Sequence, residues 1–277
     1  MSTPLGDFVR TRRDSTSPES VGLPAGSRRR APGLRRSELA SLAGISVEYL
    51  VRIEQGRDRN PSPAVVNAVA EAMRLDPADR EHLRYLAKIS SGTCLGALTQ
   101  PRDDVRPTVL RLLGQLEPAA AMVTNRTGDV LASTTGFDLL ARASGLLDGD
   151  RPNLTTYVFT DPRARDAFPD WDLVVDECVH NLWLGPSAER SAAFRAELEA
   201  LVGDELTQRL RRHVVPPRRP LRWVHPTVGE LRLDREVLEL PADDAQQVVV
   251  LLPADDATAD ALDRLRRTSS GTLRAVR

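Results

Sequence analysis

The spacing of apolar residues in the first ninety positions is typical of short amphipathic helices. Apolar residues recur at intervals of three and four, and the periodic segments are separated by glycines and capping residues. Ser46, Ser62 and Asp76 stand where helix N-caps are expected, and a proline directly follows the last two. Five helices are therefore predicted, at residues 5–13, 34–43, 46–55, 62–73 and 77–88.

Two stretches without this periodicity divide the chain. Residues 14–33 are rich in Ser, Pro, Gly and Arg, and they are predicted to form a loop between the first two helices. Residues 91–104 contain many small and polar residues, and they are predicted to form a linker. A chain of 277 residues is long enough for two domains that each bury a core.

Beyond the linker the pattern alternates between helix and strand periods. A helix is predicted at residues 106–116, and the apolar runs 119–124 and 129–133 are predicted to form a hairpin with Gly128 in its turn. From Trp171 to Trp183 the apolar residues form one continuous stripe at helical spacing. Three further strands and a final helix are predicted at residues 221–225, 230–240, 246–252 and 257–267.

The strand predicted at residues 230–240 changes phase along its length. Leu231 and Leu233 alternate in one register, whereas Leu238 and Leu240 alternate in the other. Such a change indicates a bulge or break near Arg235.

The order of elements predicts a multidomain protein. Residues 1–90 are expected to form an all-α five-helix domain, and residues 91–104 to link it to a second domain. Because strands are followed by helices and then by strands, residues 105–277 are expected to form an α+β domain with an antiparallel sheet.

Charge is distributed unevenly over these two parts. Residues 1–90 hold 15 Lys and Arg against 11 Asp and Glu, and the remainder holds 23 against 28. No acidic residue interrupts the run from Arg28 to Arg36, which contains Arg29, Arg30 and Arg35 as well. Only the first part is therefore expected to bind a polyanion.

Several classes of protein lack support in the sequence. No apolar run approaches the ~18 residues of a membrane span, no secretory signal is recognisable, and Cys94 and Cys178 are expected to be reduced thiols in a cytoplasmic protein. His180, His213 and His225 lack metal-ligand spacing, so neither a metal nor a cofactor is expected. Without a Gly-x-Ser-x-Gly sequence or a glycine-rich phosphate loop, an enzyme is the least supported alternative.

Residues 38–56 have the pattern of a helix-turn-helix. Gly44 stands in the turn, where positive φ is needed, and Ile45, Leu50 and Ile53 are expected to close the core between the two helices. In the first of these helices, Leu42 is also expected to be buried. The stretch resembles the Cro and lambda-repressor type of helix-turn-helix, the XRE family, whose second helix enters the major groove of DNA.

This resemblance implies a set of DNA-binding residues. Arg52 and Glu48 could read base edges, and Arg36 matches a family position that contacts phosphate. Arg13 and Glu54 match an internal salt bridge of the family, and are expected to be structural. For the arginines the alternative is a solvated face, and for Arg28–Arg30 it is a loop that only raises non-specific affinity. The candidate DNA-binding residues are Arg28, Arg29, Arg30, Arg36, Ser46, Val47, Glu48, Tyr49, Arg52, Arg57 and Arg59.

A second resemblance covers nearly the whole chain. It rests on Phe168-Pro-Asp-Trp171, Arg212-His213-Val214, His225-Pro-Thr-Val-Gly-Glu-Leu231, Pro32-Gly-Leu-Arg-Arg36 and Glu54-Gln-Gly-Arg57. These segments resemble actinobacterial regulators in which an MmyB-like ligand-binding domain follows an XRE helix-turn-helix. The resemblance implies a PAS-like fold whose pocket accepts a fatty acid or a similar apolar small molecule. This chain has Ser133-Thr134 where the family usually has Trp-Asn.

The apolar stripe from Trp171 to Trp183 is the expected wall of such a pocket, and Arg222 or His225 could orient a ligand. The alternative is that these residues form only the core of the domain. The candidate ligand-binding residues are Phe137, Leu140, Phe159, Phe168, Trp171, Val175, Val179, Trp183, Arg222 and His225.

The expected function is that of a homodimeric transcriptional regulator on a pseudo-palindromic operator in double-stranded DNA, biased by a small apolar ligand. The alternative is a DNA-binding protein whose second domain serves only oligomerisation or protein contacts.

Overall fold

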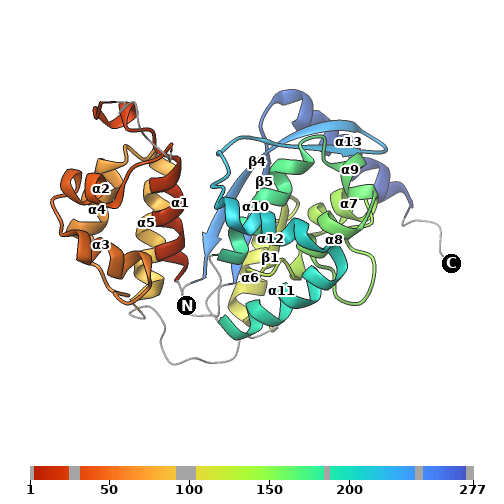
Figure 1. The fold of residues 1–277 in the computed structure, drawn as a ribbon. Coiled ribbons are helices and arrows are strands. Elements are labelled where there is room, and N and C mark those ends of the chain that lie inside the picture. Colours follow the sequence, from red (N-terminus) through yellow and green to blue (C-terminus); the bar gives the residue numbers. More distant parts are fainter. Residues whose placement is uncertain (1–2, 25–31, 92–103, 184–187, 241–245, 273–277) are drawn as a thin grey trace. The chain divides into compact units, whose positions relative to one another are not determined.

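The computed structural model describes residues 3–24, 32–91, 104–183, 188–240 and 246–272. The chain separates into two compact units (Figure 1). The first unit comprises Met1–Leu98 together with Arg211–Val215, and the second comprises Thr99–Leu210 and Pro216–Arg277. Most of the linker predicted at residues 91–104 lies outside the described residues.

The described part of the first unit contains the five expected helices. Ser46 and Ser62 cap their helices as predicted, because each side-chain oxygen accepts a hydrogen bond from the backbone N–H three residues later. A short 3-10 helix at Glu19–Val21 lies within the predicted loop. The α-helices are α1 (Pro4–Ser15), α2 (Arg36–Leu42), α3 (Val47–Glu54), α4 (Pro63–Ala72) and α5 (Pro77–Ser90).

The core of the first unit joins all five helices. Leu39 and Leu50 are fully buried where α2 meets α3, and Gly44 adopts the left-handed conformation expected of the turn, with φ of +64°. Leu42 was expected in this core, but its side chain is 40% exposed. The reason is geometric, because the face of α2 that carries Leu39 and Ala40 is the one that packs inward.

The segment Arg211–Val215 belongs to the first unit although it lies far along the sequence. The backbone carbonyl of His213 accepts a hydrogen bond from Arg12 Nη2 at 3.0 Å, and the His213 ring contacts the Phe8 ring edge-on. Burial lowers the pKa of His213 to about 4. The first unit is therefore assembled from two separate stretches of chain.

The second unit contains a five-stranded antiparallel sheet with strand order β2-β1-β5-β4-β3. This confirms the predicted fold class, and the order agrees with a PAS-like sheet. Gly128, with φ of +95°, lies in the turn of the predicted hairpin. The strands are β1 (Ala120–Thr124), β2 (Val130–Ser133), β3 (Leu221–His225), β4 (Gly229–Glu239) and β5 (Gln247–Pro253).

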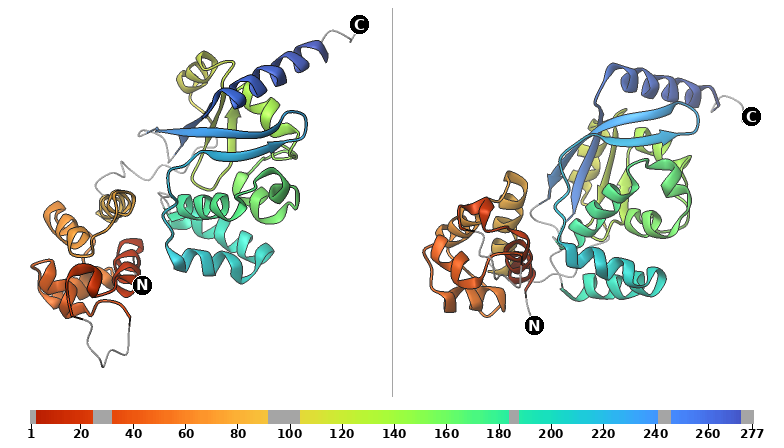
Figure 2. Two further views of the ribbon diagram at one scale, coloured as in Figure 1. Left: turned by 90° about the horizontal axis from the view of Figure 1, so that it is seen from above. Right: turned by 45° about the horizontal axis from the view of Figure 1, so that its top comes forward.

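Helices cover both faces of this sheet (Figure 2). One face packs Ala121, Val123, Val248 and Val250 against the helix α6 (Pro107–Gln115). The other face is buried beneath a larger apolar core. That core draws on the helices α7 (Thr135–Arg142), α8 (Leu154–Thr160), α9 (Arg163–Ala167), α10 (Trp171–Trp183), α11 (Ala188–Val202), α12 (Asp204–Arg212) and α13 (Asp256–Thr272).

The bulge predicted near Arg235 is wrong. β4 pairs with β5 in one register from Leu233 to Glu239. The phase change arises because the two ends of β4 have different surroundings. Leu231 and Leu233 face the larger core, and Arg235 on the same face pairs with Glu177 of α10. Leu238 lies on the opposite face and is 53% exposed.

Among the described residues, no helix combines the length and the apolar character required to span a membrane.

Candidate functional site

The candidate DNA-binding surface is built on α3. Leu50 and Ile53 anchor one face of this helix in the core, so the opposite face points outward. Val47 is 37% exposed, and Glu48 and Arg52 are exposed beside it. We call Val47, Glu48, Tyr49 and Arg52 the reading surface.

Within the reading surface, Tyr49 and Arg52 form a pair. The Arg52 guanidinium carbon lies 5.2 Å from the centroid of the Tyr49 ring, which is a cation–π contact one helical turn apart. Burial and the nearby Asp58 raise the pKa of Tyr49, so the phenol stays protonated. Asp58 is itself held to the end of α3, because its backbone N–H donates to the Arg52 carbonyl. This pairing restricts the directions in which Arg52 can point.

Glu54 lies beneath this surface and accepts from two arginines. Its side chain is 2% exposed, and it bonds Arg13 Nε and Arg36 Nε, each at 2.7 Å. Burial of Arg13 lowers its pKa, but the hydrogen bond and charge of Glu54 outweigh that effect, so the pKa of Arg13 is raised. The structure thus contains the Arg13–Glu54 pair expected from the resemblance. It also ties Arg36, which was expected at a phosphate, to the same carboxylate.

The remaining candidate DNA-binding residues lie around the reading surface. Ser46 is exposed at the N-cap of α3, and Arg57 and Arg59 are exposed in the segment after it. The Arg57 backbone N–H donates to the Arg52 carbonyl, which holds this segment against the end of α3. Arg28, Arg29 and Arg30 lie outside the described residues.

Most of the candidate ligand-binding residues lie in the larger core of the second unit. Trp171 is 8% exposed, and Phe159 and Trp183 are partly buried. Arg222 instead lies on the outer face of β3, where it pairs with Glu230 at 2.9 Å. That position does not suit a role in orienting a buried ligand. The fully or nearly fully buried candidates are Phe137, Leu140, Phe168, Val175, Val179 and His225.

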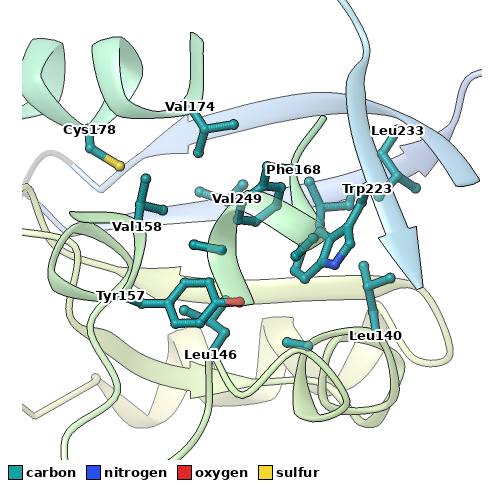
Figure 3. Close-up of a cluster of buried hydrophobic side chains, with 14 of the residues drawn as sticks. Leu140, Leu146, Tyr157, Val158, Phe168, Val174, Cys178, Trp223, Leu233 and Val249 are labelled. Atoms are coloured by element: carbon teal, nitrogen blue, oxygen red, sulfur yellow. The ribbon is translucent and has the colours of Figure 1, made fainter. Parts of the chain in front are cut away.

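Four aromatic side chains contact one another in this core, and Figure 3 labels three of them, Tyr157, Phe168 and Trp223. The Phe168 ring lies 5.0 Å from Trp223 and 6.5 Å from Tyr157, and Phe137 lies 6.4 Å from Trp223. All three contacts are edge-on, the geometry that aromatic quadrupoles favour. We call Phe137, Tyr157, Phe168 and Trp223 the aromatic cluster.

The polar atoms of this core are paired to different extents. Tyr157 donates its hydroxyl to the Ser144 carbonyl, and Trp171 donates Nε1 to the Val158 carbonyl, both at 2.8 Å. Trp223 Nε1 has no hydrogen-bond partner among the described residues. Trp223 is not among the residues predicted from the sequence, although it alternates with His225 on one face of β3.

A surface hollow of about 390 Å³ borders the aromatic cluster. Phe168 and Trp171 contribute to its lining, together with Arg165 and Asp170. The Arg165 guanidinium carbon lies 3.7 Å from the Trp171 ring centroid, so this rim combines apolar and charged groups.

Thr134 stands where the family usually has Asn, and it has a clear structural role. Its hydroxyl accepts the Phe137 N–H at the N-terminus of α7 and the Ala121 N–H of β1, and it donates to the Ala119 carbonyl. Thr134 therefore joins the sheet to α7.

No group of His, Cys, Asp and Glu within the described residues has the arrangement of a metal site. Burial lowers the pKa of His225 and raises the pKa of the Cys178 thiol to about 12, so both side chains are uncharged at neutral pH.

An exposed reading helix in a helix-turn-helix and an α+β unit with a closed apolar core define a DNA-binding transcription regulator. Comparisons with known families agree, since a helix-turn-helix domain profile matches residues 4–83. The profile of the MmyB-like transcription regulator ligand binding domain matches residues 105–265, more than half of the chain. The chain belongs to this family of MmyB-like transcription regulators. No curated protein shows significant sequence similarity to it.

Proposed function

We propose that this regulator acts in the cytoplasm as a homodimer, reads a pseudo-palindromic operator through α3, and binds a small apolar molecule that biases this affinity. The reading surface supports the DNA-binding part, because Val47, Glu48 and Arg52 are exposed on a helix whose opposite face is buried in the core. An acyl compound with an apolar chain suits the apolar core of the second unit.

Substitution of Arg52 tests the DNA-reading role. Arg52→Ala should relax specificity at one base pair of the operator, because a bidentate contact to guanine is worth about 1–3 kcal/mol of discrimination. Affinity for single-base operator variants, measured by fluorescence anisotropy at several salt concentrations, gives the readout.

Arg57→Ala is the matched control, because this exposed residue is expected to contact phosphate. It should weaken all sequences similarly and reduce the salt dependence of binding. The reading surface is wrongly assigned if Arg52→Ala also lowers affinity uniformly.

Exposed apolar side chains favour a second candidate function for the second unit. Leu110 and Leu112 of α6 are 47% and 46% exposed, and Leu252 of β5 is 42% exposed. Such side chains suit a protein-contact or oligomerisation module. In that case the protein purified from its own host carries no small molecule in native mass spectrometry.

A further inference from the structure

We propose that the second unit recognises an uncharged hydrogen-bond acceptor, such as the carbonyl of a ketone, ester or amide on an acyl chain, through the indole N–H of Trp223. The inference rests on the proposed function, since it requires that this core accept a small molecule.

The first observation is the environment of the Trp223 indole. The side chain is 2% exposed, and its Nε1 has no partner within the described part of the chain. A buried donor without an acceptor costs about 1–3 kcal/mol, so most buried donors are paired. The indole of Trp171, in the same core, does donate to a carbonyl.

The indole nitrogen lies among apolar side chains. Figure 3 shows it on the side of Leu140, with Phe168 beside the ring. Trp223 also shares its core with Leu231 and Leu233 of the neighbouring strand. An alkyl chain would be compatible with these surroundings, and one acceptor atom would satisfy the donor.

His225 is the nearest polar residue on the same face of β3, two positions further along. Its Nδ1 accepts the Thr227 N–H, so the ring proton belongs on Nε2, near the backbone of Leu139. Burial lowers the pKa of His225, so the ring is neutral. It therefore offers no positive charge to a carboxylate.

The charges around the core decide between an acid and an uncharged ligand. Arg126 and Arg209, the arginines of the second unit described as buried, are already paired, Arg126 with Glu239 and Arg209 with Asp172 and Asp176. The partly buried Arg195 instead donates to the Leu182 carbonyl and lies over the Trp183 ring, and Arg165 and Arg219 line the surface hollow. A carboxylate buried without a counter-charge is strongly disfavoured. An uncharged carbonyl oxygen accepts the same hydrogen bond at a much smaller cost of desolvation.

Phe168 lies between the Trp223 indole and the surface hollow. Its residue lines the hollow on one side, and its ring contacts Trp223 on the other. A ligand that enters from the hollow reaches Trp223 by displacing the Phe168 ring.

Three probes of similar size test the proposal on the full chain: decan-2-one, 2-methyldec-1-ene, which replaces the carbonyl oxygen with a methylene group, and decanoic acid. Wild-type protein labelled with ¹⁵N at the indole nitrogens should bind the ketone several-fold more tightly than the alkene. The ketone, unlike the alkene, should shift the Trp223 indole resonance downfield. Trp223→Phe should reduce affinity for the ketone by about 3- to 10-fold more than it reduces affinity for the alkene, because only the ketone loses a hydrogen bond.

The opposite results overturn the proposal. One such result is that Trp223→Phe lowers affinity for the ketone and the alkene equally, or leaves affinity for the ketone unchanged. Another is that decanoate binds near neutral pH as tightly as the ketone. The proposal is also overturned if the bound ketone does not shift the Trp223 indole resonance and the indole proton transfers magnetisation only to water. That result would show that a buried water accepts the hydrogen bond. If none of the probes binds while the protein still binds its operator, the ligand-binding function itself fails. That result differs from failure at Trp223, where the probes bind but the variant does not discriminate between them.

Discussion

Glu54 is the residue on which the geometry of the reading helix depends most directly. Its buried carboxylate joins Arg13 of α1 to Arg36 of α2 from a position on α3. One side chain thus fixes three helices relative to one another. Because the Arg13 side chain is only 9% exposed, loss of the carboxylate would leave a guanidinium with little access to water.

Glu54→Gln should therefore destabilise the first unit by about 2 kcal/mol, since the buried charge pair is broken while the shape is retained. Glu48→Gln is the matched control, because it makes the same change on the exposed face of the same helix and should alter stability by less than about 0.5 kcal/mol. Chemical denaturation followed by circular dichroism measures both. Similar stabilities for the two variants would show that Glu54 is not a structural residue.

At the level of elements, the sequence predicted those whose signals are local. Capping serines set the starts of α3 and α4, and Gly128 marked the turn between β1 and β2. The helices α7 and α8 were not predicted, because their N-caps, Thr134 and Asn153, begin short segments whose stability comes from burial against the sheet and other helices. Tertiary context likewise decided β4, where a change of neighbours resembled a change of register.

The two candidate sites also differ in whether local sequence signals or tertiary contacts define them. The reading surface lies on one helix, and helical spacing alone identified its exposed positions. The aromatic cluster brings together residues from α7, α8, β3 and the segment after α9, and no spacing rule joins them. Pairing of Trp223 Nε1 depends on those distant neighbours, so the sequence could not reveal its lack of an acceptor.

Two glycines provide a test of the elements that carry them. A side chain at Gly44 meets open space but must adopt φ of +64°, so Gly44→Ala should cost about 1 kcal/mol. Gly114 lies within α6, also in open space and without a positive φ. Gly114→Ala should therefore stabilise the second unit by about 0.5 kcal/mol. Thermal unfolding of both variants gives the signs, and a stabilising Gly44→Ala would contradict the assignment of the turn.

At the scale of the whole molecule, the proposed dimer and the proposed ligand make one joint prediction. Two reading helices related by a two-fold axis should protect operator half-sites centred about 34–36 Å apart. Ligand and operator must influence each other's affinity equally if they are coupled. Footprint titrations should show the same two half-sites for protein stripped of small molecules and for protein reloaded with them. The protein concentration at half-maximal protection should differ between the two. One half-site at saturation contradicts the dimer, and identical midpoints contradict the coupling.

The inclusion of Arg211–Val215 in the first unit affects which fragments of this protein are suitable for experiments. A recombinant fragment that ended at residue 90 would contain every helix of the DNA-reading part but not the peptide that contacts Phe8 and Arg12. Those contacts would not contribute to the free energy of folding of the fragment. Titrations with such a fragment would therefore report on an incomplete folding unit, and a synthetic peptide spanning residues 211–215 is the natural reagent for complementation in trans.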